Sequence, residues 1–211
     1  MRSAALALIA ASIASGGQPA FEGGSQPIAG HVRERIVGSS WHRGCPVGLE
    51  KLRLLRLTYW GFDDRAHRGR LVVNRRFDEE IVRVMKRLYR LRYPIRRMRL
   101  IDRYDADDHR SMSADNTSAF NCRFVAGTNR WSMHAYGLAI DLNPVENPYV
   151  SGSHVSPPAG RPYADRSRHA RGMVHAGDPV VRAFARSAGW EWGGSWAGAT
   201  RDFQHFSANG R

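Results

Sequence analysis

Two short segments of this 211-residue chain most constrain what it can fold into. The first, SMHAYGLAID, places His134 and Asp141 seven residues apart with Gly137 between them. The second, DFQHF near the C-terminus, places Asp202 three residues before His205. Two imidazoles and one carboxylate form a three-ligand zinc set that leaves the fourth tetrahedral position to water, which is typical of catalytic rather than structural zinc sites. The remaining carboxylate suits a general base beside such a site.

Each of these residues also has an ordinary explanation. A single histidine on a partly apolar strand is usually a hydrogen-bonded core residue. Asp141 could cap a turn at Asn143-Pro144, and Asp202 could be a loop carboxylate paired with an arginine. Three further histidines are rival ligands, namely His154, His169 and His175. They have no compact spacing, so we expect them to be surface residues or substrate contacts.

The pattern S-x-H-x-x-G-x-A-x-D at residues 132–141 resembles the signature of zinc D-Ala-D-Ala carboxypeptidases of the VanX and VanY type. It is also similar to that of their relatives, the L-Ala-D-Glu endopeptidases of bacteria and phages. The tail GWEWGGSW, followed by D-x-x-H-F, resembles the endopeptidase branch most. The resemblance runs from about residue 71 to residue 206. It implies an α+β fold of the hedgehog/DD-peptidase type.

The resemblance also implies a site. His134, Asp141 and His205 would bind Zn²⁺, and Gly137 would allow the tight turn that brings His134 back beside the strand with Asp141. Asp202 would be the catalytic base. Strict strand alternation puts residues of odd separation on opposite faces, so Asp202 is expected in a bend or bulge just before the strand of His205.

Substrate contacts are predicted on the segment before the first block. Arg123 lies where the family tends to place polar groups facing the peptide, and its guanidinium would suit a stem-peptide carboxylate. Asn116, Ser118 and Asn121 alternate along one segment and could bond the peptide backbone. Ser132 could do the same, or cap the turn at His134.

Two positions depart from the endopeptidase branch, which often has Gly-Gly-Asp-Trp and Asp-x-Pro-His-Phe. Ser195 and Gln204 stand there in this chain. Neither replaces a ligand, so they leave activity intact and make the choice of bond open. We expect Trp190, Trp192 and Trp196 to pack in the core, with one of them free to flank the cleft.

The N-terminus is typical of an export signal. Arg2 is followed by a small apolar stretch over residues 3–14, and small-residue cleavage sites could end at Ala14 or Ala20. The alternative is the N-terminus of a cytosolic protein. We predict a secreted or cell-envelope protein, with residues 1–38 as signal and flexible linker and residues 39–211 as the catalytic domain.

The two cysteines, Cys45 and Cys122, form an even set, which in an exported protein suggests a disulfide. Two free buried thiols are the alternative. A zinc-ligand role is open to them too, although neither has a second cysteine at CxxC spacing.

The formal net charge is +13, almost entirely from arginine. Such a field attracts polyanions: wall polymers and anionic lipids for an exported protein, nucleic acid for a cytosolic one. We expect anionic cell-wall polymers as partners and no nucleic acid. The densest arginine run, 83–99, is interpreted as the solvated face of an amphipathic helix. Its apolar stripe is predicted to consist of Ile81, Val84, Met85, Leu88 and Leu91. No apolar run approaches the roughly 18 residues of a membrane span, so we expect no transmembrane segment, and a monomer.

Periodicity and turn residues predict the elements. The expected helices cover 46–58, 77–93 and 179–188. The expected strands cover 71–74, 98–101, 118–124, 138–142, 190–192 and 202–206. Residues 102–115 are expected to form an acidic loop, and 143–177 a surface insertion over the site. This order indicates a single α+β domain with a mostly antiparallel sheet flanked by helices.

The sequence thus predicts an exported zinc metallopeptidase acting on peptidoglycan stem peptides, either as a D-Ala-D-Ala carboxypeptidase or as an L-Ala-D-Glu endopeptidase. The alternative is a zinc-stabilised wall-binding module of the same fold without catalysis. Asp202 separates the two, because a non-catalytic module has little reason to keep a carboxylate there.

Overall fold

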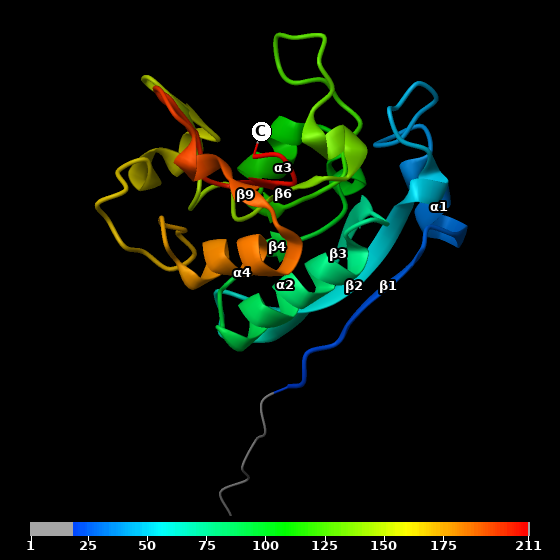
Figure 1. The fold of residues 1–211 in the computed structure, drawn as a ribbon, viewed down its shortest axis with the longest axis horizontal. Helices are drawn as coiled ribbons and strands as arrows, with labels where there is room; N and C mark the ends of the chain where they lie inside the picture. Colours follow the sequence, from blue (N-terminus) through cyan, green and yellow to red (C-terminus); the bar gives the residue numbers. More distant parts are fainter. Residues whose placement is uncertain (1–18, 211) are drawn as a thin grey trace, which may run out of the picture.

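A three-stranded antiparallel sheet forms the base of the molecule in a computed structural model that describes residues 19–210 (Figure 1). Its strands are β1 (Gly23–Pro27), β2 (Leu52–Trp60) and β3 (Ala66–Asn74), in the order β1-β2-β3. Strands β2 and β3 pair along their whole length, so that Leu55 faces Leu71 across the ladder. The sheet is the platform on which the helices and the segments of the site lie.

Strand β2 replaces the helix that was predicted for residues 46–58, and that prediction was wrong. Leu55 and Leu57 belong to the large core under the helices, whereas Leu52 and Leu54 belong to a second core on the opposite face. A strand buried on both faces has a nearly continuous apolar run, whose adjacent leucines can be mistaken for helical spacing. The nearby helical structure is one short turn, η1 (Leu49–Lys51).

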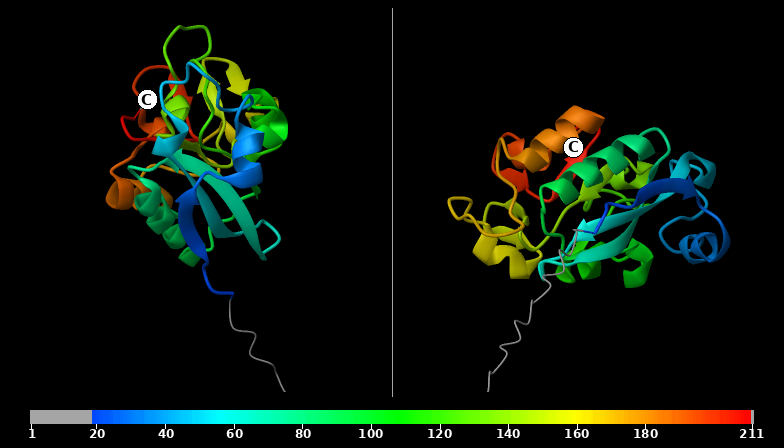
Figure 2. Two further views of the ribbon diagram at one scale, coloured as in Figure 1. Left: turned by 90° about the vertical axis from the view of Figure 1, so that its right-hand side faces the viewer. Right: turned by 90° about the horizontal axis from the view of Figure 1, so that it is seen from below.

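Helix α2 (Asp78–Arg90) lies across this sheet and packs beside α4 (Pro179–Ala188), as the two views of Figure 2 show. The predicted apolar stripe is confirmed from Ile81 to Leu88, and its arginines face solvent. Leu91 was expected to continue the stripe but is 44% exposed, because the helix has already ended.

The predicted boundaries of α4 are confirmed. Asp178 is its N-cap residue, Pro179 is the first helical residue, and Gly189 ends it in a left-handed conformation at φ +69°. The Asp178 carboxylate accepts a hydrogen bond from the backbone N–H of His175 at 2.7 Å, and makes no side-chain bond to the helix.

The α+β class is confirmed, with the remaining strands distributed over several small sheets instead of one. One sheet has the order β6-β11-β9 and another β10-β7-β8, both antiparallel. Their bounds are β6 (Ala139–Asp141), β7 (Tyr149–Ser151), β8 (His154–Ser156), β9 (Glu191–Trp192), β10 (Thr200–Asp202) and β11 (His205–Ser207). A parallel pair joins β4 (Arg97–Met98) to β5 (Asn116–Thr117).

Two predicted strands are shorter than expected. The buried strand at 98–101 reduces to β4, and the strand at 118–124 is an extended segment whose backbone bonds go to several elements. Ser118 exchanges bonds with Asp141, Phe120 donates to Val72, and Cys122 donates to Ser40. This segment therefore has the composition of a strand, but no single strand pairs with it along its length.

The two predicted loops contain structure. Residues 102–115 include most of η2 (Ile101–Tyr104) and all of α3 (Asp108–Ser113), while 143–177 include β7, β8 and η4 (Pro158–Tyr163). The second loop is therefore only partly a surface insertion. Its first residues are among the most buried of the chain, including Asn143 and Asn147.

Residues 19–38 differ from the predicted flexible linker. They contain β1, which pairs with β2, and α1 (Gly30–Ile36), whose Val32 and Ile36 are buried against Leu52 and Leu54. The folded part therefore begins before the predicted boundary at residue 38. The predicted export signal lies mostly in residues 1–18, outside the described residues. No helix between residues 19 and 210 is long and apolar enough to cross a membrane.

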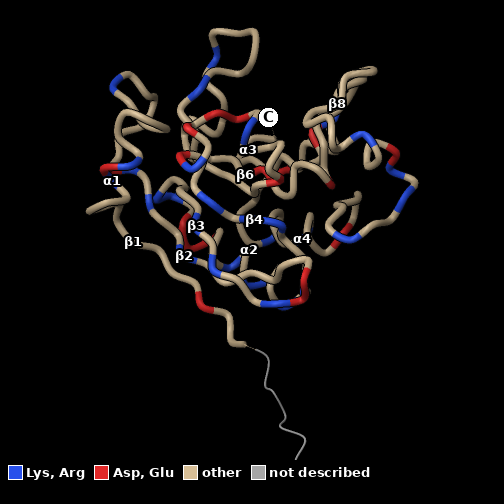
Figure 3. Tube along the Cα trace, turned by 180° about the vertical axis from the view of Figure 1, so that it is seen from behind, with Lys and Arg blue, Asp and Glu red and all other residues tan. Residues whose placement is uncertain are grey.

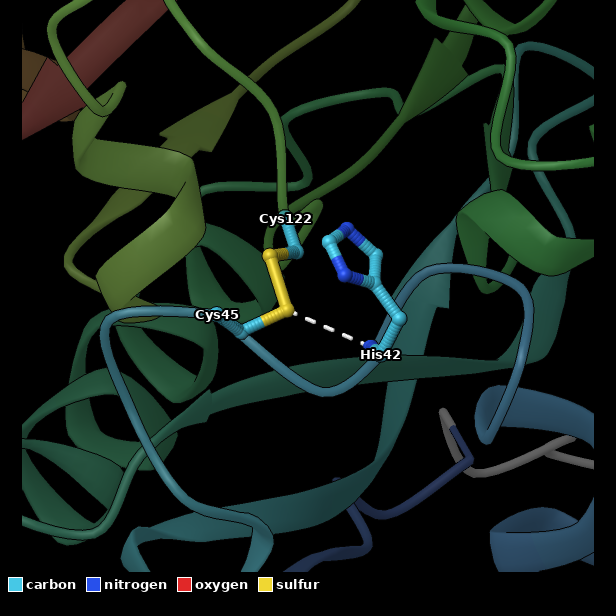
Figure 4. Close-up of side chains that lie close together, drawn as sticks. All are labelled: His42, Cys45 and Cys122. Carbon is cyan, nitrogen blue, oxygen red and sulfur yellow. Dashed lines mark hydrogen bonds between the residues drawn. A yellow bond between two sulfur atoms is a disulfide. The ribbon is translucent and has the colours of Figure 1, made fainter.

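The predicted disulfide between Cys45 and Cys122 is present, with a Cα–Cα distance of 5.8 Å (Figure 4). It joins positions 77 residues apart and ties the loop before β2 to the segment that leads into the first sequence block. Both sulfurs are used in the bridge, so neither is a thiolate ligand while it is closed.

Replacing both cysteines by serine should lower the free energy of unfolding by about 2–4 kcal/mol, because the unfolded chain loses its cross-link. Urea unfolding followed by tryptophan fluorescence measures this, with the wild type under thiol reductant as a second comparison. Equal midpoints for the oxidised wild type and the double variant would contradict a stabilising bridge.

Candidate metal centre

Strand pairing brings the two sequence blocks together. Asp141 ends β6 and His205 begins β11, and the two residues are direct partners in the antiparallel ladder. His134 comes from the turn η3 (Met133–Tyr136) just before β6. Ser132 caps that turn, its hydroxyl oxygen accepting from the backbone N–H of His134 at 3.3 Å. Gly137 then reverses the chain with φ +67°, as predicted.

The three side chains converge on one point. His134 Nε2 lies 3.2 Å from Asp141 Oδ2, His205 Nδ1 lies 3.1 Å from Asp141 Oδ1, and the two ring nitrogens are 3.3 Å apart. Ligand atoms of a tetrahedral zinc ion are separated by roughly 3.3 Å, given bonds of about 2.0–2.1 Å. The side chains are buried, with residue exposures of 3, 4 and 6% for His134, Asp141 and His205.

Protonation also suits a cation. His134 Nδ1 lies 2.6 Å from the carbonyl oxygen of Ala119, which can only accept, so Nδ1 carries a proton and Nε2 is the ring atom that points to the centre. This second contact orients the ring, as is usual for metal-binding histidines. Although burial alone would raise it, the neighbouring His134 and His205 hold the pKa of Asp141 well below its usual range, so the carboxylate is ionised. The donor set therefore fits a zinc ion.

Asp202 lies beside this group at the end of β10, separated from β11 by a two-residue bend. This is the break before the strand that its spacing from His205 requires. Its Oδ1 atom is buried and has no hydrogen-bond partner among residues 19–210. Burial raises the pKa of Asp202 to about 6, and the Asp141 carboxylate adds to that rise while His205 opposes it.

Gly193, in the turn η5 (Gly193–Ser195), gives Asp202 and His205 the room they need. A Cβ atom at this position would lie 2.5 Å from the Asp202 carbonyl oxygen and 3.2 Å from His205 Cβ. The ring of Trp196 lies 5.8 Å from the His205 ring. Of the three tryptophans, Trp190 and Trp192 are buried in the core, and Trp196 is the one beside the site.

The residues predicted to contact substrate lie in different environments. Arg123 is half-buried and its guanidinium forms an ion pair with Asp108 at 2.7 Å. Ser118 lies next to the centre, because its backbone pairs with Asp141. Ser132 acts as a cap, the second of its two predicted roles.

The two asparagines of that segment have structural contacts. The Asn116 amide bonds the backbone of Arg99 in both directions and the hydroxyl of Ser111, and the residue has no exposed surface. Asn121 donates to the carbonyl of Ala106 at 3.1 Å. These contacts leave the Asn116 amide unavailable to a peptide.

Among residues 19–210, two groups place three metal-ligand atoms within reach of one another: His134 with Asp141 and His205, and His42 with Cys45 and Cys122. In the second group, drawn in Figure 4, the sulfurs form the disulfide and the backbone N–H of His42 donates to Cys45 Sγ. The rival histidines of residues 143–177 are in neither group, although the rings of His169 and His175 stack at 4.4 Å.

Sequence reasoning missed a buried polar network just after β6. Glu146 lies 3.2 Å from the Arg96 guanidinium, which also contacts Asp115, and the ring of Phe62 covers the guanidinium at 3.7 Å. Burial raises the pKa of Glu146 to about 8, helped by the Asp115 carboxylate and opposed by Arg96. The one signal in the sequence was the polar string N-P-V-E-N directly after an apolar strand.

Comparison with known proteins agrees with this geometry. Residues 126–208 match the model of the D-alanyl-D-alanine carboxypeptidase family. All three donors and Asp202 lie inside the matched segment, which is similar to this peptidase family. The match confirms the family resemblance and supports a peptidase activity. No curated protein and no solved structure shows a significant match to the chain.

Gly193→Ala should weaken zinc binding by about 10–100-fold, because the new methyl group pushes on residues that orient the donors. Competition with a chromophoric chelator measures the affinity. Gly24→Ala is the matched control, since a Cβ at Gly24 meets nothing within 4 Å. Equal affinities for the two variants would contradict the close approach of Gly193 to the site.

Glu146→Gln should remove part of the pH dependence of stability. The folded-state pKa of Glu146, about 8, is above its ordinary value near 4.3, so its contribution is complete below that value and is lost as the pH rises through 8. The difference in urea midpoint between wild type and variant should therefore shift in favour of the variant between about pH 5 and pH 8.5. Glu79→Gln, at an exposed position of α2, should show no such trend. A difference in urea midpoint that stays constant across this pH range would refute the raised pKa of Glu146.

Proposed function

We propose that this protein is a zinc-dependent peptidase that hydrolyses peptide bonds in peptidoglycan stem peptides, with His134, Asp141 and His205 holding the zinc ion. The observation that carries the proposal is the convergence of these three buried donors beside the carboxylate of Asp202, whose Oδ1 atom has no hydrogen-bond partner among residues 19–210. Their position inside the segment that matches a carboxypeptidase family supports the same conclusion.

Zinc bound at such a site lowers the pKa of a water molecule to about 7 and polarises the substrate carbonyl. Asp202 is the catalytic base: it accepts a proton from the attacking water through Oδ1, then donates it to the leaving amine as the carbon–nitrogen bond breaks. A base that both accepts and donates works best with a pKa near the working pH, and the raised pKa of Asp202, about 6, suits both steps.

The substrate carboxylate is assigned to Arg123. Its guanidinium is held by Asp108 at 2.7 Å and is half-buried, which fixes its direction before the peptide arrives. A planar guanidinium can bond both oxygens of a carboxylate. Trp196, beside His205, provides an apolar wall for a small side chain such as that of alanine.

Two bonds of the stem peptide fit this proposal, the terminal D-Ala-D-Ala bond and the L-Ala-D-Glu bond. The tail resembles the endopeptidase branch except at Ser195 and Gln204. Ser195 bonds the Trp192 carbonyl at 2.6 Å and so stabilises its own turn, while Gln204 lies in the bend before His205. Identification of the reaction product would show which of the two bonds is cut.

Export to the cell envelope is part of the proposal. A disulfide persists in oxidising compartments and is rare in the cytosol, and the peptidoglycan substrate is outside the membrane. Arg2 and the apolar run that follows it support the same location.

Asp202→Asn should lower kcat by about 10²–10⁴-fold while zinc affinity and substrate binding change little, because the amide cannot accept the proton. Mass spectrometry of defined muropeptides, incubated with the zinc-loaded protein, measures turnover and identifies the bond. Asp64→Asn is the matched control, since Asp64 is an exposed carboxylate paired with Arg171.

Loss of one D-Ala, or release of a fragment that begins with D-Glu, is expected from the zinc-loaded wild type and not from chelated samples. Intact muropeptides with a folded, zinc-loaded wild type would refute the peptidase and leave a wall-binding module. Full activity of Asp202→Asn would refute only the role of Asp202 as the base and would leave the peptidase proposal standing.

A further inference from the structure

A second feature of the molecule lies along β3 and is formed by none of the three metal-site residues. A groove of about 250 Å³ is formed between α1, β3, β4 and η2. Its walls carry His31 and five arginines: Arg35, Arg68, Arg70, Arg99 and Arg103. All five arginines are exposed, and no aspartate or glutamate of residues 19–210 lines the groove. Figure 3 shows Lys and Arg positions recurring around β3 and β4.

The fold places several arginine side chains next to one another on one face of the sheet. Arg70 on β3 is the direct ladder partner of Arg56 on β2, so two guanidinium groups start from the same face at adjacent positions. Arg68, two residues along the same strand, points to that face too. Like charges directly opposite in a sheet are destabilising. The arrangement therefore opposes folding and is unexplained by packing.

Carboxylates neutralise little of this charge. Of the five groove arginines, Arg68 has an ion pair within the described part of the chain, with Glu22 at 2.7 Å, and both side chains are exposed. Two acidic residues close in sequence to Arg103 have other contacts. Asp102 accepts from the backbone N–H of Ser40, and Asp105 pairs with Arg110.

The floor of the groove is apolar, made by Val32, Met98 and Leu100. No phenylalanine, tyrosine or tryptophan among residues 19–210 lines it. Single-stranded nucleic acids are held by aromatic rings that stack on bases, along with a basic channel. A groove of arginines over an aliphatic floor suits instead a chain of phosphates joined by short carbon units, since guanidinium groups bond phosphate oxygens in pairs and the carbon units lie on the floor.

We propose that this groove binds a polyol-phosphate polymer, an anionic chain of the cell wall, at a site separate from the metal centre. The groove is connected to that centre through one segment. Arg99 is bonded to Asn116, and two residues on, Ser118 pairs with Asp141. A polymer held in the groove keeps the metal centre close to the wall. Binding here is independent of the proposed peptidase activity and is measured without it.

The test uses the full, disulfide-bonded chain and a fluorescent oligomer of 1,3-poly(glycerol phosphate), with binding followed by anisotropy. The groove variant combines Arg70→Gln with Arg103→Gln. The control combines Arg87→Gln with Arg90→Gln on α2, which removes the same charge from equally exposed positions outside the groove. Binding is measured at about 50 and about 200 mM salt, because phosphate contacts release counterions.

We expect the groove variant to bind at least about tenfold more weakly with a shallower salt dependence, and the control to stay within about twofold of wild type. Arg70→Gln alone should raise the melting temperature at low salt, because it relieves the repulsion with Arg56. A variant that melts at a higher temperature is folded, so a loss of binding could not then be explained by unfolding.

Equal loss in the groove and control variants would overturn the proposal, since only net charge would then matter. An unchanged affinity of the groove variant would overturn it as well. Duplex or single-stranded DNA of equal phosphate number that binds more tightly, and depends on the same arginines, would replace the wall polymer by nucleic acid as the occupant.

Discussion

The pairing of β6 with β11 is the contact on which the site depends. It places Asp141 directly opposite His205, although 64 residues separate them, and the turn before β6 adds His134 at the same point. The two strands are only three residues long, so their own hydrogen bonds stabilise them little. Their position is maintained by the core beneath, where Ile140 and Phe206 are completely buried.

Burying three polar donors at one place carries a cost that a metal ion would offset. Isolated ionisable groups are expensive in the interior unless they are paired or bind a metal. Here a carboxylate is held ionised between two imidazoles, and a second carboxylate, Asp202, is held largely protonated at low pH by the same burial. The pKa values of these two neighbouring carboxyl groups are shifted in opposite directions, which agrees with the proposed roles of Asp141 as a metal ligand and Asp202 as a base.

Sequence patterns succeeded where one local rule decided the outcome. Helix α4 has a capping residue, a proline and a terminal glycine in the expected order, and α2 has an apolar stripe of helical period. Sequence patterns failed where the conformation of a segment depends on the elements that pack against it. The leucines of β2 were assigned to a helix because both faces of that strand are covered, and a period of two is then hidden in a continuous apolar run.

By itself the sequence determined the residue types of the site, the cysteine pair and the excess of arginine, because these are properties of composition and spacing. Only the tertiary structure decided which residues meet. It used Asn116 to bond the backbone of Arg99, left Asp202 Oδ1 without a hydrogen-bond partner in the described part of the chain, and set Arg56 opposite Arg70. Each of these facts depends on strands and loops far apart in the chain, whose pairing is chosen by burial of the whole core and cannot be derived from any one segment.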